Sequence, residues 1–170
     1  MSVICPRCGK DNTIPFSDSV YHTHGFECQD CKKDFGVDDG TKLKEWEQEL
    51  LSLEYEREDK DHTKKIIEIT IAEDKVTLTP SIIYPDKMKQ PIESQDITPM
   101  KDNLLQLIFE KLYVLDWNRI NVGFVTGKDE TFELRLNFKT KPEISYSGTN
   151  RFPPYLKVLD QLFSSFFELQ

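Results

Sequence analysis

The chain has 170 residues, of which 38% are hydrophobic and 11% aromatic, and it carries a net charge of −8. This composition is typical of one or two small folded domains and excludes a wholly disordered chain. Acidic residues outnumber basic ones in each of the segments 1–40, 41–65 and 66–170. The charge therefore argues against the basic surface that phosphate backbones require.

No stretch of the sequence approaches the roughly 20 consecutive apolar residues that span a bilayer. The start, MSVICPRCG, lacks the charged segment and apolar run of a secretory signal. We therefore expect a cytoplasmic protein without a membrane partner. In a reducing compartment its cysteines are not expected to form stable disulfides.

Residues 1–40 are polar, rich in turn-forming residues, and contain the four cysteines of the chain in two pairs. Cys5 and Cys8 form one C-x2-C pair, and Cys28 and Cys31 form the other, with nineteen residues between them. Two such pairs can place four thiolates at the corners of a tetrahedron around one zinc ion. Because the segment lacks the hydrophobic periodicity of a core, we expect a structural Zn²⁺ to hold it together.

The sequences CPRCG and CQDCKKDFG resemble the knuckles of the zinc-ribbon superfamily, over about residues 3–37. This resemblance implies a zinc ribbon in which the four cysteines bind a structural zinc ion. Members of the superfamily serve nucleic-acid machines, enzymes and protein adaptors alike. Gly9 follows the first pair and suits the tight turn of a knuckle, whereas Lys32 stands at the matching position of the second.

Three alternatives compete with structural zinc. The opening CPRCG also resembles the iron site of rubredoxin, but the second pair lacks the matching Pro and Gly, and the surrounding aromatic residues are sparse. A pair of disulfides needs an oxidising compartment. A catalytic zinc normally keeps one open position beside three protein ligands, whereas four cysteines close the shell.

Segment 41–61 is predicted to be a connecting amphipathic helix. An apolar stripe recurs at intervals of three and four residues, formed by Leu43, Trp46, Leu50 and Leu53. Thr41 is the expected N-cap. The stripe is expected to dock on the protein itself, with a partner protein as the alternative.

From residue 62 to 170 the pattern predicts an α+β domain, with an antiparallel sheet and helices packed on one face. Strands are expected where apolar and polar residues alternate, in KKIIEITI, VTLT, RINVGFV, TFELRLNF and PEISYS. The segment PSIIYPDKMKQPIESQ is expected to hold at most a short edge strand and then a loop. Helices are expected from Thr98, which would cap the first, and from about Pro153.

The segment SYSGTNRFPPY joins the last expected strand to the last helix, and it is the best candidate for a ligand or partner site apart from the metal. The candidate residues are Tyr146, Ser147, Gly148, Thr149, Asn150 and Arg151. They can offer backbone N–H groups, a guanidinium and an aromatic ring to a ligand. The same residue types also cap helices and turn corners, so the structural interpretation stays open.

The sequence favours a non-catalytic zinc protein that contacts another protein through the ribbon and the helix around Trp46. It contains none of the common nucleotide-binding or nucleophile motifs, so no catalytic residue is assigned. The alternative is a nucleic-acid-associated ribbon of the transcription type. Basic residues near the knuckles support it: Arg7, Lys10, Lys32 and Lys33. A third interpretation is an enzyme with a site around residues 146–155.

Overall fold

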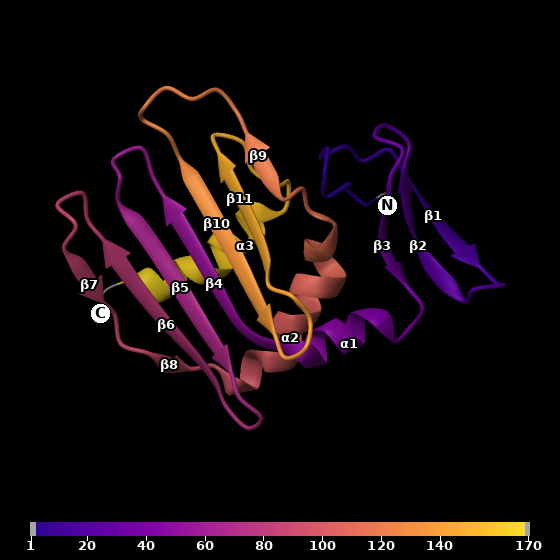
Figure 1. Cartoon of the computed structure of the whole chain (residues 1–170), viewed down its shortest axis with the longest axis horizontal. Coiled ribbons are helices and arrows are strands. Elements are labelled where there is room, and N and C mark those ends of the chain that lie inside the picture. The colour runs from indigo at the N-terminus through magenta and orange to yellow at the C-terminus, as the bar shows by residue number, and fades with distance from the viewer. Residues whose placement is uncertain (1–2, 169–170) are drawn as a thin grey trace. The chain divides into compact units, whose positions relative to one another are not determined.

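The computed structural model describes residues 3–168 and has an α+β fold (Figure 1). Contacts divide it into two compact units. The ribbon unit comprises the described chain up to Gln48, Asp102–Asn118 and Pro153–Tyr155. The sheet unit comprises Glu49–Lys101, Arg119–Phe152 and the described chain from Leu156 onward. This division differs from the linear boundaries expected at residues 40 and 61, because each unit gathers segments that are distant in sequence.

The ribbon unit contains a three-stranded antiparallel sheet in the order β1-β2-β3. Its strands are β1 (Thr13–Asp18), β2 (Thr23–Cys28) and β3 (Asp34–Asp38). Its helical parts are α1 (Lys42–Glu49), most of α2 (Lys101–Gln106), the π-helical turn η2 (Leu107–Lys111) and the 3-10 turn η3 (Val114–Asp116). The first 40 residues therefore contain a three-stranded antiparallel sheet beside the four cysteines, and a distant segment completes the unit.

Helix α1 is much shorter than the helix expected over residues 41–61, so that prediction was wrong. The helix ends at Glu49, and the next nine residues form β4 (Leu50–Glu58). This strand lies between β5 and β10 in the sheet, so its backbone groups are satisfied by ladders on both sides. Its alternation buries Leu53 and Tyr55, which are 2% and 3% exposed.

Thr41 occupies the expected N-cap position of α1, since its carbonyl accepts the N–H of Glu45 at 2.9 Å, but two aspartates rather than its hydroxyl accept the first N–H groups. The Oδ1 atom of Asp39 accepts the N–H groups of Thr41 and Lys42, at 2.8 and 2.9 Å. The Oδ1 atom of Asp38 accepts the N–H of Leu43 at 3.1 Å. A carboxylate is a stronger acceptor than a hydroxyl. Donation from the Thr41 hydroxyl and from these N–H groups lowers the pKa of Asp39 to about 2.

The sheet unit is built on one mixed sheet of eight strands. The order is β7-β6-β5-β4-β10-β11-β9, and β8 pairs with β6. The remaining strands are β5 (Lys64–Ile71), β6 (Val76–Ile83), β7 (Lys89–Pro91), β8 (Gln95–Asp96), β9 (Ile120–Val122), β10 (Thr131–Phe138) and β11 (Ile144–Thr149). Strand β9 runs parallel to β11, so the expected purely antiparallel sheet needs correction at this edge. The reason is that the chain reverses direction between β9 and β10, and β11 lies between these two strands. Because β11 is antiparallel to β10, it runs in the same direction as β9.

The predicted alternation is confirmed along the central strands. In β10, alternate residues are buried from Phe132 to Phe138. Strand β6 continues through Pro80 to Ile83 and lies between β5 and β7, whereas at most a short edge strand was expected from Pro80 onward. The carbonyl of Pro80 accepts the N–H of Ile92 at 3.1 Å, so the proline still takes part in pairing through its acceptor.

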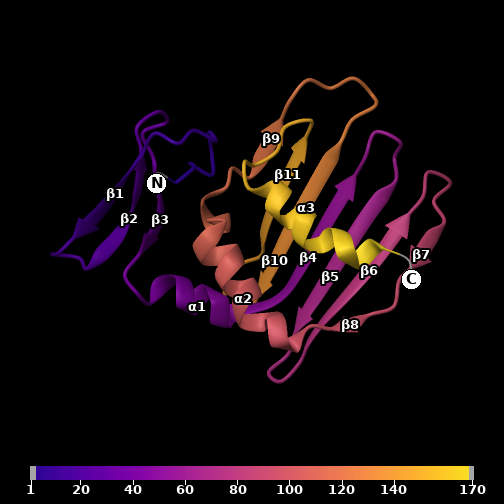
Figure 2. The same cartoon turned by 180° about the vertical axis from the view of Figure 1, so that it is seen from behind.

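Helix α3 (Leu156–Ser164) crosses one face of the sheet and is followed by the 3-10 turn η4 (Ser165–Phe167) (Figure 2). Its Leu156, Leu159 and Phe163 are buried. The helix expected from Thr98 begins instead as a 3-10 turn, η1 (Thr98–Met100), before α2. All described helices are short, and none within residues 3–168 has the length and apolar character needed to cross a bilayer.

Candidate metal centre

The two cysteine pairs lie on loops that share one backbone pattern. In each loop the N–H of the first cysteine donates to the carbonyl five residues later, at 2.9 Å for Cys5 and 3.1 Å for Cys28. The N–H four residues later donates back to the carbonyl of that cysteine, at 2.9 Å in both loops. Gly9 and Lys32 occupy this fourth position with φ of +76° and +62°. Lys32 therefore takes the left-handed conformation, at a cost of about 1–2 kcal/mol.

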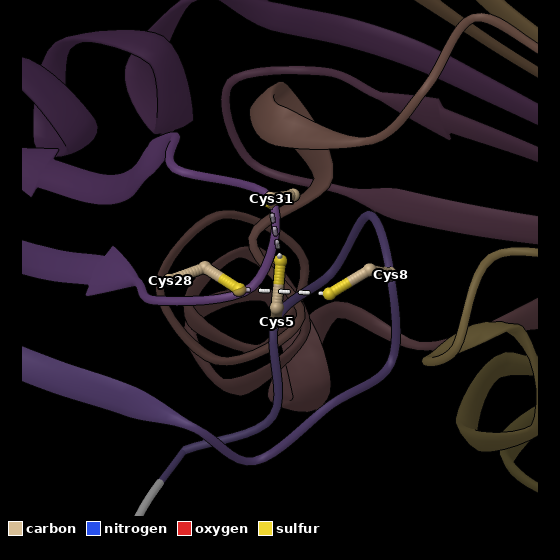
Figure 3. A group of neighbouring side chains, drawn as sticks. All are labelled: Cys5, Cys8, Cys28 and Cys31. Atoms are coloured by element: carbon tan, nitrogen blue, oxygen red, sulfur yellow. Dashed lines mark hydrogen bonds between the residues drawn. The ribbon is translucent and has the colours of Figure 1, made fainter.

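The four cysteine side chains point toward one another from these two loops (Figure 3). The Sγ atoms of Cys5 and Cys31 are 3.8 Å apart, those of Cys8 and Cys28 are 3.5 Å apart, and all four lie within 4.8 Å of one another. A tetrahedron with metal–sulfur bonds of about 2.3 Å has edges of about 3.8 Å. None of the four thiols is in a disulfide. The site therefore fits one ion with little rearrangement.

Backbone N–H groups in each knuckle donate to the sulfur of the first cysteine, and they act against the effect of burial on its pKa. Burial raises the pKa of Cys5 to about 12. The N–H groups two and three residues further on donate to its sulfur and lower the pKa, but burial has the larger effect. Burial also raises the pKa of Cys28, but the matching N–H groups in the second knuckle, together with the thiols of Cys8 and Cys31, outweigh burial and lower the pKa to about 7. These donors stabilise the charged form that a metal requires.

An aromatic cluster packs beside the sulfurs. The rings of Phe26 and Phe35 are stacked at 5.4 Å, and the ring of Tyr113 meets that of Phe35 edge-on at 5.1 Å. Tyr155 extends the cluster, 6.0 Å from Tyr113. The expectation of sparse aromatic surroundings was wrong, because two of these rings come from segments far along the chain. Aromatic content thus does not separate zinc from iron at this site.

Comparison with protein-family models, curated proteins and solved structures found no match for this chain. What the geometry establishes is a centre of four cysteines placed to bind one metal ion.

Asp116, in the segment after α2, connects the first knuckle to β3. Its Oδ2 atom accepts the N–H of Gly36 at 2.9 Å, and its Oδ1 atom accepts from Arg7 at 3.3 Å. Arg7 lies inside the first knuckle and also donates to the carbonyl of Asp34 at 2.9 Å. A single carboxylate thus connects both halves of the ribbon within the unit.

Replacing Asp116 by alanine should destabilise the ribbon unit by about 1–3 kcal/mol, since a half-buried guanidinium and an amide both lose their acceptor. Asp116→Asn should lose less, because it keeps a neutral acceptor for Gly36. Urea unfolding followed by Trp fluorescence measures both, since Trp46 and Trp117 lie in the ribbon unit, with Asp102→Ala as an exposed control on the same segment. Equal midpoints for Asp116→Ala and Asp102→Ala would contradict the bridging role.

A buried carboxyl group lies in the ribbon unit away from the metal site. Glu47 on α1 is 8% exposed, and its Oε2 atom lies 3.4 Å from Lys44 Nζ. Lys44 also pairs with Glu110 of η2, at 3.2 Å. Burial, and then the neighbouring Glu110 carboxyl, raise the pKa of Glu47 to about 7, while the pKa of Glu110 is lowered. Lys44 thus forms ion pairs with two carboxyl groups, those of Glu47 and Glu110.

The unfolded chain ionises Glu47 near pH 4.5 but the folded chain only near pH 7, so stability falls as pH rises through this window. Glu47→Gln should therefore stabilise the protein by about 1–2 kcal/mol at pH 8 and by much less at pH 5. The full shift of the pKa from 4.5 to about 7 corresponds to roughly 3 kcal/mol, with the attraction of Lys44 already included, and is therefore the upper bound of this gain. Thermal unfolding at both pH values checks this, with exposed Glu45→Gln as control. A gain that does not depend on pH would refute it.

The candidate residues 146–151 do not all belong to one surface: Ser147, Gly148 and Thr149 line a shallow depression in the sheet unit, whereas the other three do not. Tyr146 is fully buried and is not accessible to a ligand from outside. Ser147, Gly148 and Thr149 belong to β11, and Arg151 is exposed. Asn150 uses its side chain within the protein: its Nδ2 atom donates to the carbonyl of Phe124 and to Asp129, both at 2.7 Å. Its role is to hold the neighbouring loop.

Sequence reasoning missed a cavity of about 230 Å³ in the sheet unit, beside α3. On its wall, Asp160 accepts the hydroxyl of Tyr55 at 2.6 Å and Nε of Arg57 at 3.1 Å. Burial raises the pKa of Tyr55, and the Asp160 charge adds to the effect. No sequence motif connects these residues, which come together only when β4 and α3 pack. Their polar groups satisfy one another.

Proposed function

We propose that this protein is a non-catalytic zinc protein that acts by contacting another protein. The observation that carries the proposal is the closed set of four sulfur ligands. Four thiolates fill a tetrahedral shell and leave no position for water or substrate. Soft sulfur ligands in this geometry suit zinc, with iron as the competing metal.

A protein partner is favoured over nucleic acid by the surroundings of the basic residues near the knuckles. Arg7 is held by Asp116, and Lys10 lies 3.9 Å from Asp30. Four thiolates with one Zn²⁺ add a charge of about −2 to this acidic segment. Phosphate binding would have to overcome that charge, which supports the protein-contact interpretation.

The tip of the β1–β2 hairpin offers a contact surface on the ribbon. Val20 and Tyr21 are 75% and 74% exposed. Their N–H groups both donate to Asp18 Oδ1, at 2.8 and 3.2 Å, so the turn that displays them is held. Apolar side chains on a fixed turn are suited to docking. Trp46, which the sequence suggested for the same role, is half-buried on α1.

Two measurements test this function. Elemental analysis of the purified protein should give one zinc per chain, and stoichiometric iron would replace zinc in the proposal. Capture from native lysate should then recover a protein partner in stoichiometric amount with the wild type but not with Val20→Ser/Tyr21→Ser. Ser19→Ala is the matched control on the same turn. Recovery of nucleic acid in a salt-sensitive manner would overturn the proposal in favour of the alternative ribbon function.

A further inference from the structure

Strand β9 and the pair Phe124 and Val125, one residue beyond its end, expose four large apolar side chains at one edge of the eight-stranded sheet. Ile120, Val122, Phe124 and Val125 are 72%, 57%, 84% and 59% exposed. We call these four residues the β9 patch. Among the described residues, no strand pairs with the outer edge of β9. Edge strands are usually protected by charged residues or proline, and this one has neither.

The backbone that displays the β9 patch is held in place by hydrogen bonds. The N–H of Gly123 donates to the carbonyl of Thr149 at 2.7 Å, and Asn150 Nδ2 donates to the carbonyl of Phe124 at 2.7 Å. Asp129 accepts the N–H groups of Thr126 and Gly127, at 2.8 and 3.1 Å. The exposure of the patch is therefore a property of a fixed loop. A fixed apolar surface loses little entropy when a partner binds it.

A depression of about 220 Å³ lies beside this patch, on the sheet face opposite α3. Figure 1 views the sheet from this face, and Figure 2 from the α3 side. The register places Ile120, Ser147 and Glu133 in one row across β9, β11 and β10. The next row contains Val122, Thr149 and Thr131.

Short side chains on β11, between longer side chains on the strands to either side, give the depression the shape of a trough along β11. Only Ser147 and Thr149, which are short, line it from this strand on the open face. Ile120 and Val122 form the wall on the β9 side, and carboxylates form the other wall. Strands two positions apart in a sheet are about 10 Å apart, which is the width needed by one extended chain with side chains on both sides.

The second wall is acidic. Glu133 projects from β10, and Glu56 and Glu58 stand behind it on β4, with Lys64 as the one cation lining the depression. Lys64 lies 3.8 Å from Glu56, which is a long ion pair. Burial raises the pKa of Glu56, and the nearby Glu54 and Glu133 carboxyls add to the effect. Arg135, beside this wall on β10, pairs with Glu133 at 2.7 Å and with Glu54 at 3.6 Å. Four carboxylates, those of Glu54, Glu56, Glu58 and Glu133, therefore stand against two cations, Lys64 and Arg135, and a net negative charge remains.

We propose that this trough binds an extended segment of a partner protein in which apolar and basic residues alternate. Side chains alternate along an extended chain, so apolar ones would contact Ile120 and Val122 while basic ones meet Glu133 and Glu56. The backbone of the segment would lie over the hydroxyl groups of Ser147 and Thr149. Charge complementarity selects a basic segment over an acidic one and over a second copy of this acidic chain. The inference goes beyond the proposed function, because it concerns the sheet unit and does not require a partner for the ribbon.

The test uses synthetic eight-residue peptides and the full-length, metal-loaded protein. One peptide alternates lysine and valine, a second has four lysines followed by four valines, and a third alternates glutamate and valine. Fluorescence anisotropy should show the first binding at least tenfold more tightly than the other two. Amide chemical-shift changes should be confined to residues 120–125, 131–133 and 147–149.

Variants separate the trough from the overall charge. Glu133→Lys and Ile120→Ser/Val122→Ser should each weaken the alternating peptide at least tenfold, while Glu73→Lys, in an exposed turn at the far end of β5, should weaken it less than twofold. The double serine variant changes only exposed side chains, so it is expected to fold. If Glu133→Lys and Glu73→Lys weaken binding of the alternating peptide equally, binding reflects the overall charge of the protein, and the proposal is overturned. Concentration-dependent dimers that Val122→Ser abolishes would assign the surface to a second copy and also overturn it. Val20→Ser/Tyr21→Ser should leave peptide binding unchanged, so failure here is distinct from failure of the ribbon function.

Discussion

Replacing one metal ligand, as in Cys28→Ser, should unfold the ribbon unit while the sheet unit stays folded. A structural zinc contributes binding free energy of order 10 kcal/mol, comparable with the whole stability of a small domain. The apolar cluster around Cys5 and Cys28 is small, with Phe35 as its remaining fully buried member. Hydrogen exchange should therefore show lost protection in β1, β2 and β3, and also around Tyr113 and Asp116, because these residues pack in the same unit.

The matched control is Asp30→Ser, which changes an exposed residue of the same knuckle and keeps all four sulfurs. Chelation of the wild-type protein should reproduce the loss seen in Cys28→Ser, and adding back one equivalent of zinc should reverse it. Amides of β4, β5 and β10 should remain protected throughout, because each of these strands is paired on both sides. Full protection of the ribbon strands in metal-free protein would show that the ion is not structural.

The metal centre was predictable because its information is local. Two residues between the cysteines of each pair fix the knuckle, and the positive φ of Gly9 was anticipated from its place after the first pair. The aromatic neighbours were not predictable in the same way. Tyr113 and Tyr155 lie more than 80 residues beyond the second pair, and no periodic pattern links them to it. Asp116 was missed for the same reason.

The error over residues 50–61 shows two periodicities competing in one segment. Leu43, Trp46, Leu50 and Leu53 fit a helical stripe, but LSLEYERE also alternates with a period of two. The strand prevails because β5 and β10 both pair with this segment, a long-range effect that local propensity does not contain. The alternating strands β5 and β10 carried one clear period each, and both were predicted correctly.

Gly148→Ala should destabilise the sheet unit by about 3 kcal/mol, although it adds one methyl group. Gly148 pairs with Phe132 in the β10–β11 register and faces the buried side of the sheet. A Cβ atom there would lie 2.5 Å from the Phe132 ring and 2.5 Å from the carbonyl oxygen of Arg151. Phe132 is 2% exposed and the carbonyl belongs to the backbone, so neither can move without disturbing the core. Urea unfolding monitored by far-UV circular dichroism measures the loss.

Ser147→Ala provides the control for Gly148→Ala, because residue 147 is the neighbour on the same strand and projects from the opposite face. It should change the free energy of unfolding by less than about 0.5 kcal/mol. The contrast between adjacent positions separates overpacking from any general effect of substitution in β11. If both variants unfold at the wild-type urea concentration, β11 does not pack against Phe132 and Arg151 as described. In that case the trough beside β9, which depends on the placement of β11, would lose its geometric basis as well.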